Sequence, residues 1–310
     1  MKYLKIILAI VLSAAFLFIY LFIPNRILVS DNVYVTQAGS SVTRSFVQIQ
    51  YWDKWMPYKA IEGHSFIWED GALEINASFI ASVKSKFTKD DFEAGVIFSA
   101  VDAGKDSSLV RFEGEVDNRH LSPITRIHNY IEAQKLKAQL LTVIKTAAAY
   151  YSTSKGVYGF DIIKTKVKDS TLVTTQQNFA DTPSLAQQYA MIDKLLKHIQ
   201  KHNGIVHGDP MVNITRVSET EVYTQVAFPL AADIPTGDQI AIKKMVLGNI
   251  LETKVQGGQT IINAAFEANR NYIADHLTSS PAIPFVTYNT NRLKESDPNK
   301  WVSTIYFPVY

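Results

Sequence analysis

Residues 222–229 read Val-Tyr-Thr-Gln-Val-Ala-Phe-Pro, and residues 301–309 read Trp-Val-Ser-Thr-Ile-Tyr-Phe-Pro-Val. Both stretches are rich in the β-branched and aromatic residues that favour strands, and both contain Phe-Pro near their end. The two Phe-Pro pairs lie 79 positions apart, and Leu172, Thr174 and Gln177 recur at the same offset as Leu251, Thr253 and Gln256. This internal repeat predicts two copies of one structural unit, at about residues 160–230 and 250–310.

Each copy contains the same order of predicted elements. A helical pattern covers residues 183–201 and recurs over residues 259–276, each time with an apolar face. The apolar faces consist of Leu185, Tyr189, Ile192, Leu196 and Ile199 in the first copy and of Ile262, Phe266, Asn269 and Ile273 in the second. Pro210 and Pro284 open the next strands, at an offset of 74. Two such βαββ units would form one sheet with both helices on one face.

The duplicated unit, residues 160–310, resembles the GyrI-like effector-binding domain, a ligand-binding module of certain bacterial transcription activators. The two quoted strands and Tyr288 carry the resemblance. In family members that bind cationic drugs, the last strand resembles Thr-Glu-Ile-Tyr, with the glutamate buried in the ligand cleft. This chain has Ser303-Thr304-Ile305-Tyr306, so Thr304 replaces that glutamate. An unpaired buried carboxylate selects a cation, so the substitution puts in doubt both cation preference and hydrolysis that relies on this acid.

Aromatic residues of the duplicated unit predict a ligand-binding cleft near the axis that relates the two copies. Aromatic walls with a few hydroxyl groups suit a flat apolar ligand. Thr304 lies in the last predicted strand, residues 301–309. Glu252 and Glu267 are the nearest acids that could contribute a negative charge to the cleft. The alternative is that the aromatic residues only pack the core. The candidate ligand-binding residues are Tyr189, Tyr223, Glu252, Glu267, Tyr288, Trp301, Thr304 and Tyr306, with Tyr272 as a further aromatic member.

The first half of the chain predicts a separate domain over residues 26–151. A strand at residues 27–36 is followed by a helix-compatible segment, a Trp-x-x-Trp-x-Pro element at residues 52–57 and strands over residues 64–116. Ser122-Pro123 is a favourable helix start, and the helix can run to about Ala149. We expect the sheet to bury its apolar stripe, which consists of Ile124, Ile127, Ile131, Ala138 and Leu141.

This order resembles the START-like (SRPBCC, polyketide-cyclase-like) helix-grip family, on the evidence of Trp52, Trp55 and Pro57. The resemblance implies an antiparallel sheet closed by a long helix, with an apolar cavity between them. The alternative is that Trp52, Trp55 and Trp68 are core aromatics. The predicted fold class is therefore α+β, a helix-grip domain followed by a duplicated βαββ effector-binding domain.

Residues 1–25 predict a membrane anchor. Ile6–Ile23 contains only Ser13 and Tyr20 as residues with polar side-chain atoms, and this length just reaches that of a transmembrane helix. A cleaved signal peptide and a buried core helix remain as alternatives. Lys2 and Lys5 would keep the N-terminus in the cytoplasm. This predicts a single-pass protein of the bacterial inner (cytoplasmic) membrane whose remaining part is periplasmic or otherwise extracytoplasmic.

Composition excludes several classes of protein and site. The chain has 310 residues, 47% hydrophobic and 19% charged, which excludes a disordered or collagen-like chain. It has no cysteine, so disulfides, thiolate metal sites and cysteine nucleophiles are excluded. Residues 1–25 contain two of the 31 basic residues and none of the 29 acidic ones. The remainder is thus balanced, and no nucleic-acid partner is expected.

No motif of an enzyme or a cofactor site stands out in the sequence. His198 and His202 have the spacing of a metal-binding pair, with His207 and Asp209 further along. Their helical positions lie away from the apolar face, which favours a solvated surface, and we predict no metal and no cofactor. Three functions remain open: a membrane-anchored, non-enzymatic protein that binds small apolar or aromatic molecules; a hydrolase or cyclase acting in the same cleft; and a structural or partner-binding envelope protein.

Overall fold

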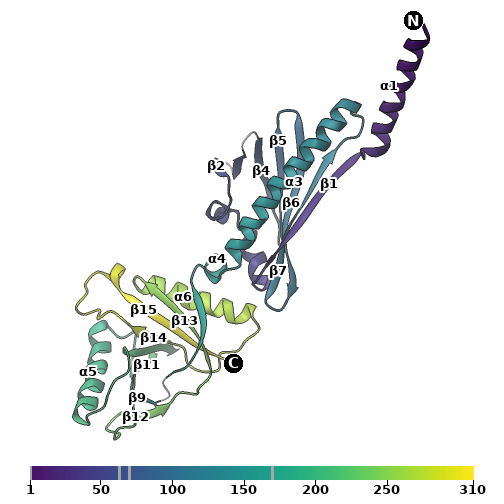
Figure 1. The fold of residues 1–310 in the computed structure, drawn as a ribbon. Coiled ribbons are helices and arrows are strands. Elements are labelled where there is room, and N and C mark those ends of the chain that lie inside the picture. The colour runs from purple at the N-terminus through teal and green to yellow at the C-terminus, as the bar shows by residue number, and fades with distance from the viewer. Residues whose placement is uncertain (1, 62–63, 69–70, 169–170) are drawn as a thin grey trace. The chain divides into compact units, whose positions relative to one another are not determined.

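Two antiparallel sheets and a few helices make up the α+β fold of this chain (Figure 1). The computed structural model describes residues 2–61, 64–68, 71–168 and 171–310. The chain divides into two compact units, the first ending at Val157 and the second beginning at Tyr158.

The first unit contains a seven-stranded sheet in the order β1-β7-β6-β5-β4-β3-β2. From β2 to β7, consecutive strands are neighbours, so that hairpins connect them, and β7 then pairs with β1. Asp90 has a positive φ of 49° in the turn between β5 and β6, a conformation that Asp tolerates in tight turns. The strands are β1 (Arg26–Val35), β2 (Lys59–Ile61), β3 (Ser65–Trp68), β4 (Gly71–Ser78), β5 (Ser82–Lys89), β6 (Phe92–Gly104) and β7 (Ser107–Asp117).

A long helix, α3 (Pro123–Tyr151), packs on this sheet and ends the first unit's core. Its start follows from the sequence, because the Ser122 hydroxyl accepts a hydrogen bond from the Thr125 N–H at 3.2 Å and Pro123 occupies the first turn. The shorter elements α2 (Gly39–Phe46) and η1 (Ile49–Lys54), a 3-10 helix, lie between β1 and β2 in the chain. The side chains that α3 buries in its second half are Leu136, Leu140, Val143, Ile144, Ala147, Ala148 and Tyr151.

The apolar residues that we predicted to be buried by α3 lie instead mostly on its exposed side. Ile124 is 74% exposed, Ile127 and Ile131 are also exposed, Ala138 is exposed, and Leu141 is only half-buried. The first turns instead bury polar residues, namely Arg126, Asn129 and Glu132. Hydrogen bonds and ion pairs compensate these buried groups, and the hydrophobic pattern alone does not reveal such partners.

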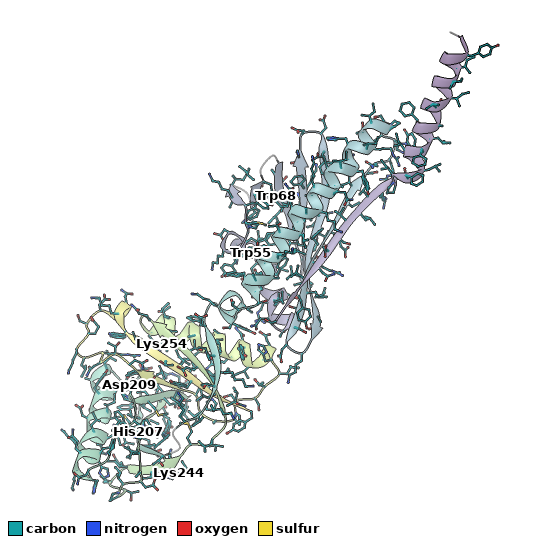
Figure 2. The ribbon with its side chains drawn as sticks, in the orientation of Figure 1. Trp55, Trp68, His207, Asp209, Lys244 and Lys254 are labelled. Atoms are coloured by element: carbon teal, nitrogen blue, oxygen red, sulfur yellow. The ribbon has the colours of Figure 1, made fainter. Side chains whose placement is uncertain are left out.

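Aromatic side chains fill the interior between α3, α2 and the sheet. Trp52 and Trp68 are fully buried and Trp55 nearly so, as expected for core aromatics. The Trp52 and Trp55 rings lie 5.0 Å apart, and the Trp55 indole N–H donates to the Tyr151 hydroxyl at 2.9 Å. Figure 2 marks Trp55 and Trp68 in this unit.

The N-terminal helix α1 spans Lys2–Phe22. Many of its described side chains are large, apolar and exposed, including Ile10, Leu17, Leu21 and Phe22. Within the described ranges, no helix is both long enough and apolar enough to cross a membrane. The span over Ile6–Ile23 stays a prediction.

The second unit contains an eight-stranded sheet in the order β12-β9-β11-β10-β14-β15-β13-β8. The elements β9–α5–β10–β11 recur as β13–α6–β14–β15, and the order is symmetric about the central pair β10 and β14. Each copy has one further strand at its outer edge, β12 beside β9 and β8 beside β13. The strands are β8 (Ile162–Lys166), β9 (Thr171–Phe179), β10 (Met211–Ser218), β11 (Glu221–Pro229), β12 (Ile240–Lys244), β13 (Asn249–Gln256), β14 (Phe285–Tyr288) and β15 (Val302–Val309).

The register of strand pairing shows that the predicted repeat offset of 79 is wrong for the first strands of the two copies. Pro229 pairs with Leu172, whereas Pro308 pairs with Ile250, so the first strands of the two copies correspond at an offset of 78 and not 79. Leu172 and Leu251 therefore lie on opposite faces of the sheet, since side chains alternate along a strand. The last strands do correspond at 79, and the central strands at 74, because Met211 pairs with Ala227 as Phe285 pairs with Tyr306.

Two helices cover one face of this sheet. They are α5 (Leu185–Lys201) and α6 (Gln259–Asp275), and their buried residues join one core with Val173, Val226, Leu251 and Phe307. The other face of the sheet has no helix on it in Figure 1. The short helix α4 (Ser154–Tyr158) lies between the long helix α3 and β8 in the chain, and another short helix, η2 (Pro298–Lys300), precedes β15.

Candidate functional site

A groove lies on the face of the second sheet that α5 and α6 leave open. Leu172, Met211 and Ala227 are buried on this face, with Phe285 and Met245 packed against them. The groove has a volume of about 260 Å3. Its lining combines these apolar residues with charged and polar ones, and consists of Thr165, Lys166, Val167, Lys168, Leu172, His207, Gly208, Asp209, Met211, Pro229, Met245, Ile250, Glu252, Phe285, Thr287, Asn289 and Tyr306. Figure 2 marks His207 and Asp209 in this unit.

Tyr306 forms the aromatic wall of the groove together with Phe285. The two residues pair across β14 and β15, and their rings stack with centroids 5.0 Å apart and an interplanar angle of 23°. On the other side of β15, Glu252 of β13 is the direct cross-strand partner of Tyr306. Directly opposed residues on one face have neighbouring side chains, so the register places a carboxylate beside the tyrosine.

The Tyr306 phenol is held in its neutral form. Burial raises its pKa to about 12, and the negative charges of Glu252 and Asp209 add to this rise, while a hydrogen bond with Thr304 opposes it. At neutral pH the hydroxyl therefore keeps its proton and can donate a hydrogen bond to a ligand. Two carboxylates near one protonated phenol make this end of the groove favourable for positive charge.

A chain of hydrogen bonds fixes Asp209 at the rim. The Asn289 amide donates to Asp209 Oδ2 at 2.8 Å, and the Thr304 hydroxyl donates to Asn289 Oδ1 at 2.8 Å. Thr304 thus affects the groove only indirectly: its hydroxyl positions the Asn289 amide, which in turn positions Asp209. Asp209 and Asn289 were not among the predicted site residues. They lie at the ends of different loops, and the only sequence signal was the proximity of Asp209 to the histidines of α5.

The groove lining also carries positive charge. Lys166 at the end of β8 and Lys168 just after it are both exposed lining residues. Leu172, Met211 and Met245 contribute apolar surface. The groove can therefore receive an apolar body and offers charges of both signs at its rim.

Three of the predicted site residues lie elsewhere, on the side of the sheet that α5 covers. Tyr189 and Tyr288 are buried there; the Tyr189 hydroxyl accepts a hydrogen bond from the Arg292 N–H at 2.7 Å, and the Tyr288 hydroxyl donates to Gln188 at 2.7 Å. The guanidinium of Arg292 lies 3.5 Å from the Tyr288 ring centroid and 5.0 Å from that of Trp301. These aromatic rings surround an arginine of the same chain, and none of them lines the groove.

Tyr223 and Glu267 also lie outside the groove lining. The Tyr223 hydroxyl donates to Gln176 at 2.8 Å on the open face of the sheet, and burial raises its pKa. Glu267 is exposed on α6 and forms an ion pair with Arg270. Of the eight predicted residues, the groove thus includes Glu252 and Tyr306, with Thr304 one hydrogen bond away.

His198 and His202 lie side by side at the C-terminal end of α5. His198 is hydrogen-bonded to the Pro235 carbonyl oxygen at 2.8 Å, and its ring lies 4.6 Å from that of His202. No group of three or more potential metal-binding His, Cys, Asp or Glu residues occurs among the residues that the structure describes.

No protein-family model and no curated protein sequence matches the chain. Among solved structures, it is similar to the C-terminal domain of EcmrR, with a TM-score of 0.42 and 10% identity over 49% of this chain and 98% of that chain. It is also similar to a hydrolase from Listeria innocua, with a TM-score of 0.36 and 8% identity over 48% and 91%. A third similar structure is SAV2435 bound to tetraphenylphosphonium, with a TM-score of 0.31 and 14% identity over 48% and 93%.

Proposed function

We propose that the chain binds a small, mostly apolar or aromatic molecule in the open-face groove of its second unit and that α1 attaches it to a membrane. The observation that carries the binding proposal is the composition of one groove wall. The stacked rings of Phe285 and Tyr306 offer an aromatic surface, and Glu252 lies directly across from Tyr306. Stacking and apolar burial provide affinity, while the phenol and the carboxylate orient a polar group.

The two acids beside Tyr306 favour a ligand with a positive group. Thr304 replaces the glutamate that the GyrI-like resemblance implies, but Glu252 lies across β15 from that strand and Asp209 lies at the rim. The proposed ligand is therefore an aromatic or apolar molecule with one cationic substituent. The resemblance of residues 160–310 to the GyrI-like effector-binding domain supports the same function.

A matched set of three naphthalene derivatives tests this proposal. They carry an aminomethyl, a carboxamide or a carboxylate group on the same ring, so that they differ mainly in charge. We expect the aminomethyl compound to raise the Tm most, because a ligand that binds only the folded state stabilises it. In Glu252→Gln its affinity should fall about tenfold, whereas the carboxamide should bind with little change.

Glu267→Gln is the matched control, since this exposed acid lies on α6 outside the groove. It should leave all three affinities unchanged. The proposal fails if no compound raises the Tm, or if Glu252→Gln and Glu267→Gln have the same effect on the cation.

A hydrolase or cyclase acting in the same groove is a second candidate, because Tyr306 is a neutral phenol next to a carboxylate. Such a pair can donate a proton and accept one. We propose the non-enzymatic function, and mass spectrometry separates the two: a bound compound should be recovered unchanged after prolonged incubation. Conversion that is lost in Tyr306→Phe would instead support an enzyme.

Membrane attachment through α1 is supported by the apolar run Ile6–Ile23 and by the exposed side chains of this helix. The proposed location is the bacterial cytoplasmic membrane, with the N-terminus inside and both units outside, since Lys2 and Lys5 precede the run. Flotation with lipid vesicles tests it. The full chain should co-float, and a chain lacking α1, residues 1–22, should stay in the aqueous fraction and remain folded, since it keeps Ile23 and Asn25, the partners of the buried Arg126. The START-like resemblance of residues 26–151 supports a helix-grip arrangement for the first unit, which this truncation should leave intact.

A further inference from the structure

The first three turns of α3 turn their apolar side outwards. Ile124, Ile127 and Ile131 are 74%, 38% and 48% exposed, and Tyr130 is 43% exposed. These isoleucines follow the i, i+3, i+7 spacing of one helix face. We refer to Ile124, Ile127 and Ile131 as the outer isoleucine face. Isolated exposed apolar residues are ordinary, but several on one face mark an interaction surface.

The inward side of the same turns is fixed by polar contacts. Arg126 is 1% exposed and donates to Asn25 Oδ1 at 2.9 Å and to the Asn118 carbonyl oxygen at 3.3 Å. Asn129 donates to Asn118 Oδ1 at 2.9 Å. Rotating α3 to bury its isoleucines would break these bonds and leave buried polar groups without partners, which is costly. The outward direction of the isoleucines is therefore a stable property of the fold.

The C-terminal end of α1 is joined to this same region. The Tyr20 hydroxyl donates to the Leu121 carbonyl oxygen at 3.1 Å, just before α3 begins. Arg126 also donates to the Ile23 carbonyl oxygen, and its guanidinium lies 4.7 Å from the Tyr20 ring centroid. The C-terminal end of α1 and the start of α3, which carries the outer isoleucine face, thus lie at the same end of the first unit (Figure 1).

We propose that the outer isoleucine face lies against the surface of the lipid bilayer that α1 enters. This inference rests on the proposed membrane attachment. Continuity with α1 selects the partner, because a unit joined to the end of a membrane helix must bring this end to the bilayer surface. Amphipathic helices at a membrane interface bury their apolar face about 5–10 Å into the bilayer, and the outer isoleucine face offers such an apolar surface. The contact would set the orientation of the first unit on the membrane.

The absence of cysteine from the sequence makes a direct test possible. Single variants Ile124→Cys, Ile127→Cys and Ile131→Cys of the full chain are labelled with an environment-sensitive fluorophore and reconstituted into phosphatidylcholine vesicles. Lys145→Cys is the control, since Lys145 is exposed on α3 about 30 Å further along the helix from Ile124. Thermal unfolding of each labelled protein verifies that it is folded.

The readout is quenching by phosphatidylcholine that carries a nitroxide high on its acyl chain. We expect about a twofold loss of fluorescence at the three isoleucine positions and almost none at Lys145, as for an interfacially buried face. Unquenched labels on chains that co-float with the vesicles would overturn the inference and leave the attachment proposal intact. Failure to co-float would overturn the attachment proposal, and this inference with it. Unquenched labels whose emission shifts to the blue as protein concentration rises would assign the face to a second copy of the chain, which also contradicts the inference.

Discussion

Glu132 is a carboxylate held inside the first unit between two lysines. Its side chain is 8% exposed and lies 3.0 Å from Lys89 Nζ and 2.7 Å from Lys135 Nζ. The hydrogen bond with Lys135 and the contact with Lys89 lower its pKa from the ordinary value of 4.5, against the effect of burial. Because the folded pKa is lowered, this group stabilises the fold above pH 4.5, and the contribution disappears as pH falls through the folded pKa.

We therefore expect Glu132→Gln to reduce the unfolding free energy by about 1–3 kcal/mol at neutral pH. The difference from the wild type should shrink as the pH is lowered below 4.5. Denaturant titrations across this range measure it. Glu113→Gln serves as the control. Glu113 is exposed, and its ion pair with Arg111 at 3.6 Å should contribute at most about 1 kcal/mol to the unfolding free energy. A penalty for Glu132→Gln that is constant with pH would contradict the assignment.

Trp301 contributes to the stability of the second unit but does not line the groove, so its substitution should affect stability and not ligand binding. Its indole N–H donates to the Glu295 carbonyl oxygen at 2.8 Å, and Arg292 lies over its ring. Trp301→Ala should lower the unfolding free energy by about 1–3 kcal/mol, because a half-buried ring and its contacts are lost. Affinity for the aminomethyl naphthalene should stay within about twofold, whereas Tyr306→Ala should lose about tenfold or more. Equal losses of affinity in both variants would contradict this prediction and indicate that the ligand binds near Trp301.

Two of the site residues were predicted from the sequence. Tyr306 belongs to the aromatic residues of the repeated strands, and Glu252 was one of the nearest acids, whereas their pairing across β13 and β15 is known only from the structure. Asp209 and Asn289 were not predicted, since each lies in a loop and only the folded sheet brings them together. Tyr189 and Tyr288 were included for their aromatic character, yet Tyr189 lies on the buried side of α5, and side-chain alternation along β14 places Tyr288 on the helix-covered face.

At the scale of elements, periodicity predicted where α3 lies but not how it is rotated. Its start at Ser122-Pro123 follows from local chemistry, whereas its face is set by Arg126, Asn129 and Glu132, whose partners come from other segments. The first strands of the repeat show a similar limit. The first strands correspond at an offset of 78 and the last strands at 79, so identical residues matched at 79 in the first strands lie on opposite faces of the sheet.

The start of α5 offers a test of local helix chemistry. Ser184 forms a capping box with Gln187: the Gln187 N–H donates to the serine hydroxyl at 3.3 Å, and the Ser184 N–H donates to the glutamine side-chain oxygen at 2.8 Å. Ser184→Ala should reduce the unfolding free energy by about 1 kcal/mol, and Ser184→Asp should recover most of the loss. Thermal unfolding of the variants measures both. Equal losses in the two variants would contradict a capping role.

At the scale of the whole molecule, the two units have separate cores. Tyr151 belongs to the first core through its bond with Trp55, whereas Tyr158 packs against Tyr272 of the second at a ring distance of 5.5 Å. Separately expressed chains of residues 23–157 and 158–310 should each unfold cooperatively, because each core, including the partners of Arg126 at Ile23 and Asn25, is complete within its own segment. Calorimetry of the two fragments tests this. A fragment without a transition would show that its core needs the other segment.

The sequence predicted the α+β class and the order of elements in both halves, since both depend on local patterns of polarity and on turn residues. It could not predict which face of the second sheet holds the groove. The repeat predicts that both helices cover one face, but the cleft was expected among aromatic residues of which several proved to lie on that face, whereas the groove lies on the other face with Leu172 and Met211.

The location of a bound ligand is the most direct test of the groove. The chain has five methionines, and they are distributed well for this purpose. Met211 and Met245 line the groove, whereas Met191 lies on the buried side of α5 and Met56 lies in the first unit. In NMR spectra of protein labelled with carbon-13 at its methionine methyl groups, the aminomethyl naphthalene should shift the Met211 and Met245 signals and leave those of Met191 and Met56 in place. Shifts confined to Met191 or Met56, or binding without any shift at Met211 and Met245, would contradict the assignment of the groove as the ligand site.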